Sequence, residues 1–254
     1  MEAVEGAVGV LKGKTAVVTG GSRGIGRAIV ERLARDGAAV VFNYARSNAA
    51  AAEVVRAVEE AGGSARGVRA DLAEPRAVER LMAVADEEFG GLDILVNNAA
   101  MNFAPAPIAG TEDELFDRVM NVNVKSAFSA VRHAARHMRD DGRIVNISTM
   151  NTVRPAPGIA PYLMSKGALE QLTAAAAREL GTRGITVNTV SPGATDTDLL
   201  RGANSADALR MIVAMTPLGR LGRPSDVADV VAFLAGPDGR WITGQNIRAT
   251  GGVA

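Results

Sequence analysis

The sequence contains no cysteine, which excludes disulfide bonds, thiolate metal ligands and a cysteine nucleophile. It has no hydrophobic run of transmembrane length, and its first ten residues lack the basic and apolar segments of a signal peptide. Neither charge is in excess, with 28 Lys and Arg against 28 Asp and Glu, and the basic residues form no stripe. We therefore expect no nucleic-acid partner, no membrane partner and a cytoplasmic location.

The 254 residues, 47% of them hydrophobic, are enough to build one large core. No linker, internal repeat or low-complexity segment divides the chain. We expect a short tail at residues 1–10 and one catalytic domain over residues 11–254.

Short apolar runs rich in β-branched residues alternate with segments of helical periodicity along the whole chain. The predicted strands are Thr15–Thr19, Val40–Tyr44, Ala65–Ala70, Ile94–Asn97, Arg143–Ser148, Thr186–Ser191 and Gln245–Ala249. The predicted helices are 25–36, Ala49–Ala61, Pro75–Phe89 with Pro75 in its first turn, a long helix capped by Thr111 and ending near Met138, Tyr162–Leu180, Asp207–Met215 and Ser225–Leu234. Residues 192–216 have weak periodicity and are interpreted as an irregular substrate loop. The alternation predicts an α/β fold, a single doubly wound parallel sheet of Rossmann-like type with helices on both faces.

A glycine-rich turn directly follows the first predicted strand. Gly20, Gly24 and Gly26 are spaced G-x-x-x-G-x-G, which differs from the G-x-G-x-x-G dinucleotide fingerprint. Glycines let a ligand approach the backbone closely, and the amide groups at a helix N-terminus attract an anion. The turn is suited to a phosphate, but turns of this type also occur without a ligand, so other stretches must decide.

Five motifs decide it: T-G-G-S-R-G-I-G at Thr19–Gly26, N-N-A at Asn97–Ala99, N-V-N at Asn121–Asn123, Y-L-M-S-K at Tyr162–Lys166 and S-P-G at Ser191–Gly193. With these motifs in this order over nearly its whole length, the sequence resembles the short-chain dehydrogenase/reductases. Within them it is most similar to the bacterial 3-oxoacyl-acyl-carrier-protein reductases, a character that many carbonyl reductases share. The resemblance implies an oxidoreductase that transfers hydride between a nicotinamide cofactor and a small carbonyl or alcohol substrate, thioester-linked ketones included. It also implies a homotetramer, with a dimer as the alternative.

Tyr162 and Lys166 stand four residues apart, so a helix presents both on one face. An ammonium beside a phenol stabilises the phenolate, which predicts a lowered pKa for Tyr162. The resemblance implies that Tyr162 is the general acid/base and that Lys166 also binds the nicotinamide ribose. It further implies that Asn123 holds a water in the proton path, and that Thr149 binds the substrate oxygen where the family usually has serine. Threonine keeps the hydroxyl, but its methyl group narrows the pocket.

The second predicted strand ends at Tyr44, where enzymes that bind the free ribose 2′-hydroxyl generally carry an acid. Arg46, with Ser47 beside it, and Arg23 are placed to flank a 2′-phosphate, which favours NADP(H) over NAD(H). The cofactor residues predicted from the turn and the resemblance are Gly20, Ser22, Arg23, Gly24, Ile25 and Gly26 at the turn, Arg46 and Ser47, Asp71 and Leu72 at the adenine, Asn98 and Ala99 at the adenosine, Tyr162 and Lys166, and Pro192, Gly193, Thr195 and Thr197 at the nicotinamide and pyrophosphate.

Three features leave alternatives open. Ala100 stands where the family usually has glycine, so either the loop differs or its backbone is ordinary there. Ala100 and Thr149 together motivate a rival hypothesis, that the protein is a nucleotide-binding regulatory or scaffold subunit. A third hypothesis is an enzyme of the same fold that catalyses an alcohol oxidation or a dehydration. His133 and His137 are four residues apart, but with no intervening glutamate and no evident third ligand we expect no metal site.

Overall fold

The structure is a computed structural model that describes residues 9–101 and 103–254. Its parallel strands form one sheet in the order β3-β2-β1-β4-β5-β6-β7. They are β1 (Thr15–Val18), β2 (Ala39–Tyr44), β3 (Ser64–Arg69), β4 (Ile94–Asn97), β5 (Arg143–Ile147), β6 (Thr186–Pro192) and β7 (Asn246–Ala249). The strand order reverses between β1 and β4, and in such sheets a ligand crevice opens at that point, beyond the carboxyl ends of the strands.

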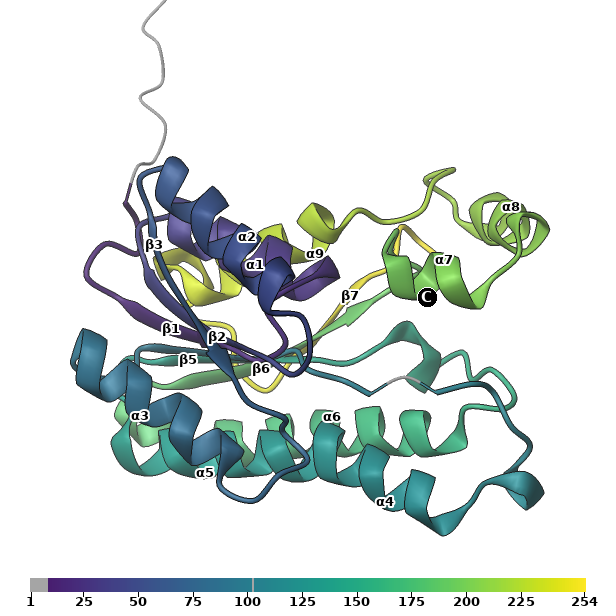
Figure 1. Cartoon of the computed structure of the whole chain (residues 1–254), viewed down its shortest axis with the longest axis horizontal. Helices are drawn as coiled ribbons and strands as arrows, with labels where there is room; N and C mark the ends of the chain where they lie inside the picture. The colour runs from purple at the N-terminus through teal and green to yellow at the C-terminus, as the bar shows by residue number, and fades with distance from the viewer. Residues whose placement is uncertain (1–8, 102) are drawn as a thin grey trace, which may run out of the picture.

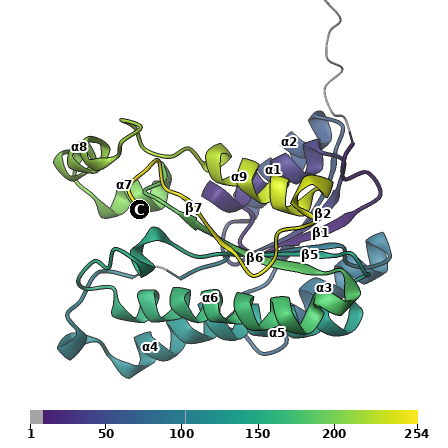
Figure 2. The same cartoon turned by 180° about the vertical axis from the view of Figure 1, so that it is seen from behind.

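Helices cover both faces of the sheet, which confirms the predicted doubly wound fold (Figures 1 and 2). One layer holds α1 (Gly24–Arg35), α2 (Asn48–Glu60) and α9 (Pro224–Ala235). The other holds α3 (Ala77–Phe89), α4 (Asp113–Met120), α5 (Ser126–His137) and α6 (Ala160–Leu180). In the part of the chain that the structure describes, no helix is both long and apolar enough to cross a membrane.

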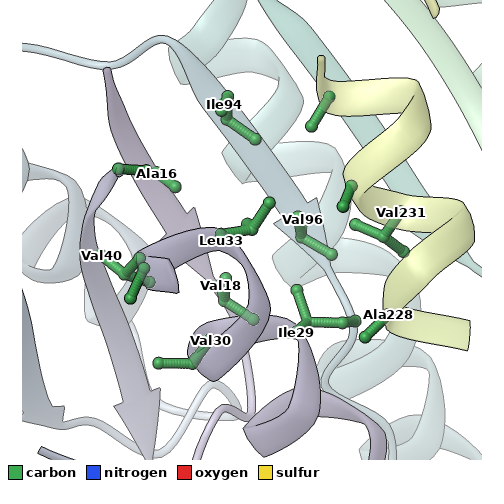
Figure 3. Packing of buried hydrophobic residues seen from close by; sticks show 14 of the residues in the cluster. Ala16, Val18, Ile29, Val30, Leu33, Val40, Ile94, Val96, Ala228 and Val231 are labelled. Atoms are coloured by element: carbon green, nitrogen blue, oxygen red, sulfur yellow. The ribbon is translucent and has the colours of Figure 1, made fainter. Parts of the chain in front are cut away.

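The strands bury both of their faces, which explains their almost continuous apolar sequences. Successive residues of β1 point to opposite faces: Ala16 and Val18 join the cluster under α1 and α9, whereas Val17 joins the cluster under α3, α5 and α6. Figure 3 shows the first cluster, where Ile29 of α1 and Val231 of α9 pack over the central strands. This packing fixes the turn between β1 and α1 on a rigid base.

Two predicted helix starts are wrong. Thr111 is not a cap, because its hydroxyl donates to the carbonyl oxygen of Pro107 (3.1 Å) and α4 begins two residues later. Pro75 lies outside α3, since Arg76 takes a left-handed conformation with φ of 62° and stops the helix from extending towards the N-terminus. The predicted long helix is also not one α-helix: the π-helical segment η2 (Asn121–Lys125) separates α4 from α5.

The segment predicted as an irregular substrate loop contains α7 (Asp198–Ala203), which was not predicted, and α8 (Ala206–Met215), which confirms the helix predicted at Asp207–Met215. Each begins with a hydroxyl cap: Thr197 Oγ1 accepts from Leu200 N (3.3 Å), and Ser205 Oγ accepts from Ala208 N (3.2 Å). α7 was missed because its six residues are too few to show a helical period. At Ala100 the backbone is ordinary, since Arg76 and Asp141 are the only non-glycine residues with positive φ among the described positions.

Candidate active site

The glycine turn is held in place by three buried or half-buried side chains. Asn43 Oδ1 accepts from Gly20 N (2.8 Å), and Asn98 Nδ2 donates to the carbonyl oxygens of Thr19 (2.9 Å) and Gly20 (3.2 Å). Thr19 Oγ1 in turn accepts from the backbone N–H groups of Asn98 and Ala99 (2.9 and 3.0 Å). We expected Asn98 to line the adenosine; its side-chain amide instead supports the turn.

Two glycines of the turn are required by its geometry. Gly20 has a φ of +69°, in the left-handed region that other residues rarely adopt. A Cβ on Gly26 would lie 2.1 Å from the carbonyl oxygen of Gly20, so the helix can approach the turn only without one. The residue before α1, Arg23, makes no side-chain cap, which leaves the first N–H groups of that helix to bind an anion. These features fit the pyrophosphate of a dinucleotide.

Exposed arginines gather at the carboxyl ends of β2 and β3. Arg23 and Arg46 are exposed, and neither has a carboxylate partner among the described residues. Arg69 ends β3 opposite Tyr44 in the parallel register, so it lies at the same edge of the sheet. Sequence reasoning missed Arg69, although the end of the third strand is where it should have been sought. Ser47, predicted to contact the cofactor, caps α2 by accepting from Ala50 N (3.2 Å).

Two residues predicted at the adenine have side chains that serve the fold. Asp71 Oδ1 accepts from Ala73 N (3.0 Å), which closes a turn after β3. Leu72 is only 7% exposed and packs into the core beneath the sheet. Its backbone, rather than its side chain, is therefore what a ligand at this position would contact.

The segment after β6 runs from the end of β7 to the glycine turn. Gly193 N donates to Ala249 O (2.9 Å), which holds the segment beside β7, and Thr195 Oγ1 donates to Gly193 O (3.0 Å). A Cβ on Gly24 would lie 3.3 Å from Thr197 Cγ2, so Thr197 sits directly beside the turn. The structure thus brings together two predicted cofactor segments that are about 170 residues apart in the chain.

Tyr162, Lys166 and Thr149 meet at the carboxyl end of β5. The first two lie on α6, and Thr149 follows β5 and precedes the short 3-10 helix η3 (Met150–Thr152). Lys166 Nζ is buried, donates to the carbonyl oxygen of Ile147 (2.7 Å) and lies 5.7 Å from the centroid of the Tyr162 ring. The hydroxyl of Thr149 lies close enough to the Tyr162 phenol to affect its pKa. A proton donor, a hydroxyl partner and a cation are therefore adjacent.

Burial controls the titration of this cluster. It raises the pKa of Tyr162, and the hydrogen bond from Thr149 lowers that pKa by a smaller amount. It also lowers the pKa of Lys166 to about 8, because the low-dielectric interior disfavours the ammonium. The predicted downward shift of the Tyr162 pKa is wrong here, since desolvation of the phenolate outweighs its stabilisation. At neutral pH the phenol keeps the proton that a general acid must donate.

Asn123 is buried and uses its side chain to join two segments of the site. It is 1% exposed, and its Oδ1 accepts from Met101 N (2.7 Å) while its Nδ2 donates to Ser165 Oγ (3.0 Å). Ser165 Oγ donates to the carbonyl oxygen of Tyr162 (2.7 Å). The side chain expected to hold a water therefore joins the loop after β4 to the first turns of α6. It lies in the π-helical segment, a type of irregularity frequent at functional sites.

His133 and His137 lie side by side on α5, with ring centroids 4.7 Å apart. Burial lowers the pKa of His133. Within residues 9–101 and 103–254 no third metal-ligating side chain joins them. The pair packs on the α5 surface, away from the cluster around Tyr162.

Comparison with known proteins identifies the family. The family model described as "Enoyl-(Acyl carrier protein) reductase" matches residues 20–254. An uncharacterised oxidoreductase of Methylorubrum extorquens is 45% identical over 245 residues, covering 96% of this chain and 98% of the relative. The chain belongs to the short-chain dehydrogenase/reductase family. It is an oxidoreductase acting on a carbonyl or CH–OH group, and its likeness to 3-oxoacyl-acyl-carrier-protein reductases is only approximate.

Two further relatives of this family carry more specific names. A hydroxynaphthalene reductase-like protein of Metarhizium brunneum is 40% identical over 256 residues, covering 95% of each chain. The solved structure of an angucycline C-6 ketoreductase with bound NADP has a TM-score of 0.90 and 44% identity, and covers 97% of each chain. Both names describe reductases.

Proposed function

We propose that this short-chain dehydrogenase/reductase is an NADP(H)-dependent reductase of ketones. The observation that carries the proposal is the Thr149–Tyr162–Lys166 cluster at the carboxyl edge of the sheet, the same edge on which the glycine turn is built. The opposite direction, oxidation of the alcohol, uses the same groups. Two observations favour NADP(H) over NAD(H): the NADP bound to the structural relative, and Arg23 and Arg46, which have no carboxylate partner among the described residues.

Different segments of the chain would bind different parts of the cofactor. The glycine turn and the N-terminus of α1 would hold the pyrophosphate, and Arg23 and Arg46 the 2′-phosphate. Thr197 and the backbone around Gly193 would close the opposite side. When bound, the cofactor supplies the hydride chemistry at the nicotinamide, and the protein supplies placement and electrostatics.

The catalytic cluster supplies the proton. Thr149 donates a hydrogen bond to the substrate carbonyl oxygen, and Tyr162 transfers its phenolic proton to that oxygen as the alkoxide forms. The Lys166 ammonium, 5.7 Å from the phenol ring, stabilises the phenolate that remains and binds the ribose. Asn123 fixes the start of α6 through Ser165, and so holds Tyr162 in place.

For the substrate we propose a ketone carried on a large apolar body. The segments that follow the carboxyl ends of β4 and β6 carry exposed apolar side chains: Ile108 is 79% exposed, Met211 64% and Leu218 68%. Such side chains stay exposed where an apolar ligand is to be bound. The name of the hydroxynaphthalene reductase-like relative points to a fused-ring substrate. A 3-oxoacyl thioester is the second candidate, favoured by the acyl-carrier-protein description of the matching family model.

The test is a matched substrate panel assayed with both NADPH and NADH. We expect NADPH oxidation with a fused-ring ketone and a steroid ketone, at lower KM than with a short acyclic ketone. Faster turnover of an acetoacetyl thioester than of the fused-ring and steroid ketones would identify a 3-oxoacyl thioester as the substrate class instead. Tight NADPH binding with no turnover of any ketone or of the matching alcohols would support a regulatory subunit instead. We also propose the homotetramer, to be measured by light scattering.

A further inference from the structure

A buried hydroxyl and a carboxylate link the two segments that carry the reacting groups. Ser148, between the end of β5 and Thr149, is 3% exposed. Its Oγ donates to Glu170 Oε1 at 2.7 Å and lies 3.4 Å from the carbonyl oxygen of Lys166. Glu170 lies on α6, one turn beyond Lys166 and two turns beyond Tyr162. This hydrogen bond therefore fastens the strand end to the catalytic helix, in addition to the bond from Lys166 Nζ to the carbonyl oxygen of Ile147.

The partner that Glu170 uses is unusual for a glutamate on a helix. Half-buried, it has no Lys, Arg or His partner within salt-bridge distance among the described residues. It accepts instead from a hydroxyl that has a single proton to give. A carboxylate acceptor makes such a bond shorter and stronger than a neutral one, so it fixes the Ser148 side chain in one rotamer.

The anchor at Ser148 sets the direction of its neighbour. Ser148 N donates to Val190 O (2.8 Å), which holds the backbone on β6 while the side chain is held on α6. Thr149 follows in an extended conformation (φ −160°, ψ 150°), and its Oγ1 accepts from Asn151 N (3.3 Å). Because Ser148 is fixed on both sides, the backbone of Thr149 is held in place, with its hydroxyl near the Tyr162 phenol.

We propose that Glu170 is a positioning residue of the reductase: through Ser148 it holds the Thr149 hydroxyl in place beside Tyr162. The proposal rests on the proposed function of this site. Glu170 contacts neither substrate nor cofactor in this proposal. It acts by fixing the position of the Thr149 hydroxyl, which binds the substrate carbonyl oxygen. Removing its acceptor lowers kcat and leaves cofactor binding unchanged.

The experiment compares Glu170→Leu, Glu170→Gln, Ser148→Ala and the double variant Ser148→Ala/Glu170→Leu with the parent enzyme. Glu179→Leu is the matched control, because Glu179 is an exposed glutamate on the same helix. We expect Glu170→Leu and Ser148→Ala each to lower kcat by about 10- to 100-fold, the size of effect that follows from misplacing a reacting group by about 1 Å. We expect the NADPH Kd to be unchanged and Glu170→Gln, which keeps an acceptor oxygen, to restore most of the loss. The double variant should be no slower than the slower single variant, since both remove the same bond.

Three results overturn the proposal: a Glu170→Leu kcat equal to that of Glu179→Leu, no rescue by Gln, or single losses that multiply in the double variant. A thermal melt of each variant separates misfolding from misplacement, and the smaller Ser148→Ala change keeps the test available if Glu170→Leu does not fold. Failure of the proposed function is seen separately, as a parent enzyme that reduces no ketone. In that case crystal structures of parent and Ser148→Ala decide: a Thr149 hydroxyl withdrawn from Tyr162 supports the proposal, and an unmoved one overturns it.

Discussion

We predict that Lys166, although required for catalysis, lowers the free energy of unfolding of the protein at neutral pH. Its side chain is fully buried, and burial lowers its pKa from 10.5 to about 8. A difference of this size corresponds to about 3 kcal/mol of lost stability at neutral pH, where the folded protein must hold an ammonium away from water. Replacing it by methionine removes that penalty and leaves the carbonyl oxygen of Ile147 without its partner, which costs about 1 to 2 kcal/mol. Lys166→Met is therefore expected to be more stable than the parent by about 1 to 2 kcal/mol, and inactive.

The stability difference should depend on pH in a defined direction. Because the pKa of Lys166 is lower in the folded chain, the unfolded chain binds more protons between pH 8 and about 10.5. The parent consequently gains stability relative to Lys166→Met as the pH rises through this window. Urea unfolding of both proteins at pH 7 and pH 10 measures this difference in the free energy of unfolding. In a thermal melt at pH 7, the melting temperature of the variant should be about 2 to 8 °C higher than that of the parent. A variant less stable than the parent at pH 7, or a difference independent of pH, would refute the reasoning.

Three more predictions concern the cofactor and the proton. Arg46→Glu should raise the KM for NADPH about tenfold or more and change that for NADH little, as steady-state kinetics with both cofactors would show; equal effects would exclude a 2′-phosphate contact. Gly26→Ala places a Cβ 2.1 Å from the carbonyl oxygen of Gly20, so NADPH binding followed by fluorescence should weaken about tenfold or more, and undisturbed binding would contradict the close approach. The kcat/KM for ketone reduction should fall as the pH rises through about 8, where free Lys166 loses its charge; a profile flat to pH 10 would show that this charge is not required.

The fold and the glycine turn were predictable because their signals are local. The sequence shows buried parallel strands as apolar runs, and it shows the turn as four glycines within the seven residues Gly20–Gly26. Tyr162 and Lys166 were found through the family motif that contains them, and their spacing predicted that they share one helix face; the structure places them in the same cluster as Thr149. These elements need no knowledge of what packs against them.

What was missed depends on tertiary contacts. The pKa of Tyr162 was predicted to fall because the spacing shows its cation but not the packing that buries it. Asn121–Lys125 (N-V-N-V-K) is rich in the weak helix formers Asn and Val, but this composition does not distinguish a π-helical segment from an α-helical one. The bond between Ser148 and Glu170 joins residues 22 positions apart, and only the fold brings the end of β5 against α6.

The most direct test of the account is Tyr162→Phe, which removes one oxygen atom and keeps the ring. It should bind NADPH as tightly as the parent while its turnover of the best ketone falls by about 100- to 10,000-fold, the usual contribution of a positioned proton donor. Turnover equal to that of the parent would contradict the assignment of Tyr162 as the acid.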